Sequence, residues 1–271
     1  MNTQQQTMRQ PVLSQWTFAD RITELGFGVA ILAGVVAILS GLGTRWGWWY
    51  YMTGLTLLRI AALSGGVASI VSLIGGALAR HEHRGAIFFV ASAGILIGLL
   101  TVGIPWSWAH RAEQMPLIHD ITTDMVNPPQ FKAIMPLRVD AENSAIYKGQ
   151  ETASQQMNAY PDIRTLTLPS SPASTFNTAL ETAKNMGWQI VDSNAKDGWI
   201  EAVASTFWFG FKDDIIVRVT PGLRGSRVDM RSTSRVGLSD IGTNADRIRT
   251  FLRRMNDAAA VSSGSSDDVG Y

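Results

Sequence analysis

The sequence contains no cysteine. A thiol nucleophile and a cysteine-ligated zinc site are therefore excluded. Only 17% of the residues are charged and the net charge is +1, which argues against a nucleic-acid partner. The phosphate-binding P-loop, the GxGxxG dinucleotide fingerprint and the GxSxG nucleophile elbow are also missing from the sequence. Because these enzyme signatures are absent, we expect no catalytic residue, no metal and no cofactor.

Three long apolar runs occupy much of the first part of the chain, at Leu25–Leu42, Leu55–Leu78 and Ala86–Ile104. Each is close to the roughly 20 residues that cross a bilayer core, and backbone hydrogen bonding in lipid makes each a helix. Aromatic residues flank the runs at Trp46–Tyr51 and Trp106–Trp108, as they do at membrane interfaces. The sequence therefore predicts three transmembrane spans in contact with membrane lipid.

The distribution of arginines predicts how these spans are oriented. Arg9, Arg21, Arg80 and Arg84 lie on one side of the predicted spans, and Arg45 and Arg111 lie on the other. Because short cytoplasmic loops carry an excess of basic residues, the N-terminus is expected in the cytoplasm. The polar half would then lie in the periplasm, anchored in a bacterial inner membrane. The first span is predicted to be a retained anchor rather than a cleaved signal peptide.

Small residues repeat every four positions along two spans, which lets helix backbones approach closely. They are Ser64, Ala68, Ser72 and Gly76 in the second run, and Gly94 and Gly98 in the third. The bundle either packs on itself or docks onto another membrane protein. Arg59 lies about one turn inside the second run, so we favour snorkelling to the headgroups over a buried ligand or ion role.

The polar half predicts an α+β fold. Residues 111–160 are irregular and are assigned as a connector that could wrap the domain, residues 161–258 as the soluble domain, and residues 259–271 as a disordered tail. Strands are expected at 164–168, 188–191, 199–205, 215–220 and 227–234. One helix is expected after the N-cap Ser171, and another from about Asn244, capped by Asp240 or by Asn244 itself. Short connections between strands predict an antiparallel sheet with two helices on one face, a two-layer sandwich after the three-helix transmembrane half.

Alternation along the strands leaves charged residues on the second sheet face. Arg218, Asp229 and Arg231 lie there, and Glu201 is expected to join them. We expect this face to be exposed as a solvated ladder of opposite charges. Alternatively, it recognises an anionic partner through Arg218, Arg231 and Arg235. Asp213 and Asp214 are expected in a solvated turn.

Several segments together resemble a known family. They are His119–Asp124, Asn127–Phe131, Trp208–Asp214, Gly225–Ser232, Ser234–Gly237, Ser239–Gly242 and Asn244–Ala245. Their combination resembles the bacterial domain-of-unknown-function family 1499, over roughly Ile118 to Met255. The three-span half is similar to the longer members of that family. The resemblance implies no established activity and supplies no catalytic residues.

The candidate binding residues outside the spans are Asp120, Thr123, Asp124, Arg218, Asp229, Arg231, Arg235 and Asp240. The segment around Thr123 and Asp124 is expected to bond local backbone, although it could instead rim a pocket with Arg235 and Asp240. His119 with Asp120 and Asp124 lacks the geometry to predict a metal site, and so does the loop His81–His83.

We expect a non-enzymatic, membrane-anchored periplasmic protein that is an accessory part of a membrane-protein complex. The alternative is a module that binds a small anionic ligand or a lipid headgroup. An enzyme with a new carboxylate site is a third hypothesis. A ligand that binds through Arg231 and Arg235 would distinguish the second hypothesis from the first.

Overall fold

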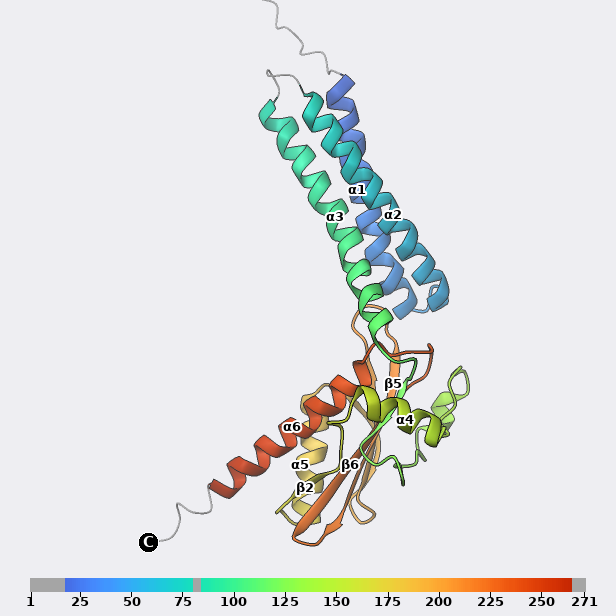
Figure 1. Cartoon of the computed structure of the whole chain (residues 1–271), viewed down its shortest axis with the longest axis vertical. Coiled ribbons are helices and arrows are strands. Elements are labelled where there is room, and N and C mark those ends of the chain that lie inside the picture. The colour runs from blue at the N-terminus through green and yellow to red at the C-terminus, as the bar shows by residue number, and fades with distance from the viewer. Residues whose placement is uncertain (1–17, 80–83, 265–271) are drawn as a thin grey trace, which may run out of the picture. The chain divides into compact units, whose positions relative to one another are not determined.

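The computed structural model describes residues 18–79 and 84–264 (Figure 1). These residues fall into two compact units, one within residues 1–43 and 49–106 and the other within residues 44–48 and 107–271. Arg9, Arg80, the loop His81–His83 and the end of the tail at 265–271 lie outside the described residues.

The first unit contains most of three helices, α1 (Phe18–Arg45), α2 (Tyr51–Leu78) and α3 (Arg84–Gln114). The last residues of α1 and α3, 44–45 and 107–114, belong to the second unit. Each helix is long and apolar enough to cross a membrane, as the three apolar runs predicted. The helices extend beyond the runs, since α3 continues past Ile104 and Pro105 to Gln114. The chain is therefore a membrane-inserted protein.

The predicted small residues bring these helices together. Ser72 is fully buried on α2, where a Cβ at Gly26 of α1 would lie 2.6 Å from its Oγ and a Cβ at Gly94 of α3 would meet the same atom. A Cβ at Gly76 would lie 2.8 Å from Cβ of Ala91. Such distances leave no space for a larger residue, so the stripe serves packing within the bundle.

The other residues assigned to membrane packing follow the same pattern, with one exception. Ala68 is buried, Ser64 is half-buried, and Gly98 approaches the backbone of Gly65. Arg59 instead is exposed on α2, which is compatible with snorkelling.

The second unit contains one antiparallel sheet in the order β1-β6-β5-β4-β3, with β2 also paired to β6. The strands are β1 (Asp120–Thr122), β2 (Leu166–Leu168), β3 (Gln189–Asn194), β4 (Trp199–Ser205), β5 (Lys212–Gly222) and β6 (Gly225–Ser234). β1 pairs with the end of β6 and β2 with its beginning. The α+β fold predicted from the sequence is confirmed.

Two helices, α5 (Pro172–Asn185) and α6 (Thr243–Gly264), cover one face of this sheet (Figure 1). The Ser171 side chain accepts a hydrogen bond from the Ser174 amide and caps α5, as expected. The core between the helices and the sheet includes stacked Trp188 and Phe251, whose ring centroids are 5.3 Å apart. Burial of this apolar face is the main source of stability for the unit.

The second sheet face is not exposed, contrary to the expectation. Residues 123–148, which we name the cover segment, lie over it and include the 3₁₀ helix η2 (Met135–Arg138). Phe131 and Ile134 from the cover segment form a small core with Val203 and Ile216 of the sheet. The alternation of side chains was predicted correctly. The connector was expected to wrap the domain, but not to cover this face of the sheet.

The expected boundaries also need correction. Residues 111–160 are not merely a connector, because they contain β1, the cover segment and α4 (Gln150–Ala159). The Gln156 side chain on α4 is fully buried and bonds both the amide (3.0 Å) and the carbonyl (2.6 Å) of Thr122. At the other end, α6 continues to Gly264, past residue 259 where the tail was expected to begin.

Candidate functional site

The centre of the polar sheet face is Arg231, whose side chain is fully buried. Its Nε and Nη2 donate to the two carboxylate oxygens of Asp120 over 2.9 and 2.7 Å. Nη1 donates to the carbonyl of Pro129 (3.2 Å) and Nη2 also donates to that of Ala145 (2.7 Å). Arg231 therefore joins β1, β6 and both ends of the cover segment through one side chain.

Two aromatic rings enclose this guanidinium. Its carbon lies 5.0 Å from the ring centroid of Phe131 and 5.5 Å from that of Tyr147. Burial and the nearby charge of Asp120 raise the pKa of Tyr147 to about 12, so the phenol stays neutral. The ring faces add cation–π attraction to a charge that has left water.

Glu201, on β4, also binds the cover segment. It is fully buried on β4, in the same cross-strand row as Ile216 of β5 and Arg231 of β6. Its carboxylate oxygens accept the backbone amides of Lys132 (2.7 Å) and Ile134 (2.8 Å). These bonds satisfy the buried charge of Glu201. They also hold a stretch of backbone that belongs to no strand or helix.

Asp214 is fully buried and bridges two arginines, although a solvated turn was expected here. One carboxylate oxygen accepts from Arg138 of η2, and both accept from Arg235 at 2.7 to 3.1 Å. Arg235 also donates to the carbonyl of Leu137 (2.8 Å), and Arg138 donates to that of Asn143 (2.7 Å). The turn expectation failed because β5 begins at Lys212, so Asp214 belongs to the strand.

Asp213 points to the opposite side and is also buried. It accepts from Nη2 of Arg247 on α6 over 2.6 Å. Neither Arg138 nor Arg247 was expected as a partner of these aspartates. The sequence did carry a signal for their opposite directions. Asp214, Ile216 and Arg218 alternate along one side of β5, so Asp213 falls on the side that the helices cover.

Arg218 forms the edge of the charged cluster. Its Nη2 donates over 3.0 Å to both Asp124 and Asp229, and Asp229 also accepts from Thr123 (3.2 Å). The side chains of Arg218 and Asp124 keep 22% and 17% exposure, in contrast to Arg231. This edge is open to water and its carboxylates are paired, but the buried Nε of Arg218 has no hydrogen-bond partner within the described residues.

The segment around Asp124 has the structural role that was favoured. Its carboxylate accepts the amides of Val126 (3.1 Å) and Asn127 (2.9 Å), which turns the chain into the cover segment. Asp240 lies apart and accepts the amides of Gly242 and Asn244, so it caps α6 as expected. Burial raises the pKa of Asp240 to about 6.

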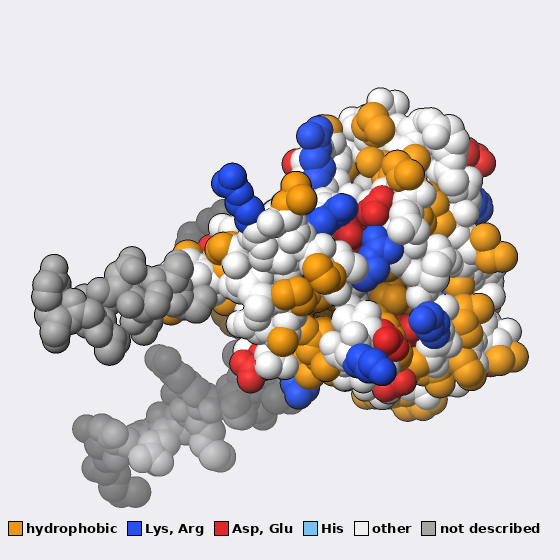
Figure 2. Space-filling view, turned by 90° about the horizontal axis from the view of Figure 1, so that it is seen from below, with side chains coloured by type: hydrophobic (Ala, Val, Ile, Leu, Met, Phe, Trp, Pro, Cys, Tyr) orange, Lys and Arg blue, Asp and Glu red, His pale blue; other side chains and the backbone are white. Residues whose placement is uncertain are grey.

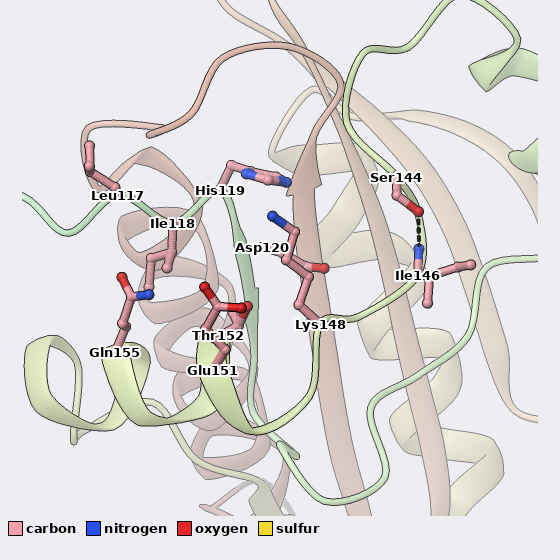
Figure 3. A pocket seen from close by; sticks show the side chains of 10 residues that line it. All are labelled: Leu117, Ile118, His119, Asp120, Ser144, Ile146, Lys148, Glu151, Thr152 and Gln155. Atoms are coloured by element: carbon pink, nitrogen blue, oxygen red, sulfur yellow. Dashed lines mark hydrogen bonds between the residues drawn. The ribbon is translucent and has the colours of Figure 1, made fainter.

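One small cavity lies beside this cluster (Figure 3). It is lined by Leu117, Ile118, His119, Asp120, Ser144, Ile146, Lys148, Glu151, Thr152 and Gln155. Burial lowers the pKa of His119 and outweighs the opposing charge of Asp120. The cavity volume of ≈ 30 Å³ holds about two water molecules. A sugar or a nucleotide would not fit.

The geometry thus assigns most candidate residues to ion pairs and hydrogen bonds inside the domain. Asp120, Thr123, Asp124, Arg218, Asp229, Arg231 and Arg235 meet beneath or at the edge of the cover segment, whereas Asp240 does not join them. Within residues 18–79 and 84–264, no group of three His, Cys, Asp or Glu side chains is placed to hold a metal ion.

Comparison with known proteins agrees with the resemblance in the sequence. The model of the family described as "Protein of unknown function (DUF1499)" matches residues 120–255, which is half of the chain. The match begins at β1 and ends within α6, so it includes the sheet, the cover segment and every charged pair above. No curated protein and no solved structure matches the chain.

Proposed function

Because the chain belongs to the DUF1499 family, whose function is unknown, we propose a function from the site: a non-enzymatic, membrane-anchored accessory protein of a membrane-protein complex. The observation that carries this proposal is that the buried charged side chains bond other parts of the same domain. Arg231, Glu201 and Asp214 hold the cover segment on the sheet instead of facing a cleft. Such a network shapes a rigid surface, and a rigid surface anchored to a membrane suits protein recognition.

The cover segment itself offers the contact surface. Five of its large apolar side chains are exposed, Val126, Met135, Leu137, Val139 and Ile146, and Val126 and Val139 are almost fully so. Apolar side chains left in water cost free energy that a partner recovers on binding. On the face shown in Figure 2, basic, acidic and apolar side chains lie among one another. This mixture suits a protein partner better than a polyanion.

The alternative function, recognition of a small anionic ligand or lipid headgroup on the sheet face, receives less support. Arg231 and Arg235 already donate to carboxylates and carbonyls of the chain. An incoming anion would have to displace Asp120 or Asp214 from a buried pair, which is costly. Arg218 is more accessible, but it is shared between Asp124 and Asp229.

The proposed location is a bacterial inner membrane, with the N-terminus in the cytoplasm and the soluble unit in the periplasm. The support is the excess of arginines before the first span and in the loop between the second and third spans. Leu223→Cys, at an exposed hairpin tip, provides a single thiol in this cysteine-free chain. A membrane-impermeant maleimide should label it in intact spheroplasts. Labelling only after lysis would place the domain in the cytoplasm.

Purification of the full-length protein from membranes, at its native level and in mild detergent, tests the function. We expect one membrane protein to co-purify stoichiometrically, and expect Val126→Asp/Val139→Asp to lose it because both changes charge the cover segment. The control Leu223→Asp/Val261→Asp charges two other exposed apolar sites and should retain the partner. Mass spectrometry of the eluates gives the stoichiometry. Purification of the wild-type protein without a stoichiometric partner would contradict the proposal.

A further inference from the structure

Exposed aromatic side chains lie in the segments of the soluble unit that directly follow the spans in the chain. Residues 44–48 and 107–114 belong to this unit, and they carry Trp46, Trp48 and Trp108 with 55%, 61% and 45% exposure. Phe207, more than 90 residues further along the chain than Trp108, is 87% exposed in the same unit. Aromatic rings next to apolar spans mark the headgroup level of a membrane, but Phe207 is far from any span in sequence.

Phe207 lies in the loop between β4 and β5, which is held in one conformation. The Thr206 amide donates to the carbonyl of Phe211 (2.9 Å), and the Gly210 amide donates back to that of Thr206 (3.1 Å). Gly210 has a φ of +68°, a left-handed conformation that suits glycine. Phe209 is buried and stacks on Phe211 at 5.3 Å. The loop therefore presents Phe207 to its surroundings from a fixed backbone.

Two residues that follow spans touch this loop within the same unit. Trp108 meets Trp208 edge to face, with ring centroids 5.4 Å apart. Arg45 donates through Nη1 to the carbonyls of Thr206 (2.9 Å) and Phe207 (2.8 Å). Trp108 is four residues beyond Ile104, or about 6 Å of helix rise past the third apolar run. Arg45 is three residues beyond Leu42, the end of the first.

From this geometry we propose that the loop 206–211 is a lipid-contacting element and that Phe207 enters the headgroup region of the bilayer. The occupant is lipid because Arg45 and Trp108, which touch the loop within the soluble unit, follow the first and third apolar runs by only three and four residues. A ring exposed at this level exchanges water for the apolar part of the interface, which is favourable. The loop would then contact lipid independently of any protein partner.

Spin labelling of the full-length chain tests the proposal, since the absence of cysteine lets one introduced thiol carry the label. Phe207→Cys and the control Leu223→Cys both modify exposed positions, one in the loop before the 11-residue strand β5 and one in the turn after it. The strand between them is about 36 Å long. Each variant is labelled with a nitroxide and placed in nanodiscs of phosphatidylethanolamine and phosphatidylglycerol. Collisions with oxygen, which concentrates in acyl chains, are then compared with collisions with a water-soluble nickel chelate.

The label at 207 should show an oxygen-to-nickel collision ratio several-fold higher than the label at 223. Equal ratios at the two positions would place Phe207 in water and overturn the proposal. Protection of position 207 from both reagents would overturn it as well, because a protein and not lipid would then cover the loop.

Discussion

Replacing Arg231 by methionine is expected to lower the free energy of unfolding of the soluble unit by about 3–5 kcal/mol, because it leaves a buried carboxylate without its cation. Asp120 would lose two hydrogen bonds, and the carbonyls of Pro129 and Ala145 would lose their donor. A loss of this size is a large part of the stability of a typical domain. Urea unfolding of the full-length protein in detergent, followed by pulse proteolysis, measures it.

Arg227→Met is the matched control, since Arg227 lies on the same strand but is exposed. It should change the free energy of unfolding little. The double variant Asp120→Leu/Arg231→Met should be more stable than Arg231→Met, because it removes the unpaired charge as well. If Arg231→Met unfolds at the same urea concentration as Arg227→Met, the buried pair does not hold the domain together.

The second large effect is expected at Asp214, where asparagine keeps the shape and removes the charge. Arg138 and Arg235 would then lose the carboxylate that both of them bind. This site is buried, because the Asp214 side chain is fully covered. The expected loss is about 3 kcal/mol, at the lower end for a broken buried pair, because Arg235 keeps some contact with water.

The same urea and proteolysis measurement gives this value, and Asp257→Asn on the exposed side of α6 is the control. Hydrogen exchange adds a local readout, because the Asn143 amide donates to the Arg235 carbonyl. Its exchange should accelerate in Asp214→Asn and not in Asp257→Asn. Equal unfolding midpoints for the two variants would show that Asp214 does not anchor η2.

The parts of the fold that could be predicted are those with local signals. β4 was predicted at its observed bounds, Trp199–Ser205, because it follows the turn formed by residues 195–198. Helix α5 begins at its proline after the Ser171 cap, and α6 begins one residue before the expected Asn244. The three apolar runs sufficed for the helices of the first unit.

The cover segment could not be predicted, because its order comes from contacts with distant residues. The Lys132 amide bonds Glu201, 69 residues later, and Arg231 bonds Asp120, 111 residues earlier. Residues 123–148 follow neither the period of a helix nor that of a strand, so an irregular connector was expected. The charged side chains of the sheet were placed correctly on one face, but without the segment above them this face was taken as exposed.

Native-state hydrogen exchange of the full-length protein in nanodiscs tests most directly whether the cover segment closes the polar face. The amides of Lys132 and Ile134, which donate to buried Glu201, should exchange as slowly as those in the middle of β5. The amide of Leu223 at the hairpin tip should exchange fast. If Lys132 and Ile134 exchange as fast as Leu223, the polar face is open and its arginines can meet a ligand, which contradicts a cover segment fixed on the sheet.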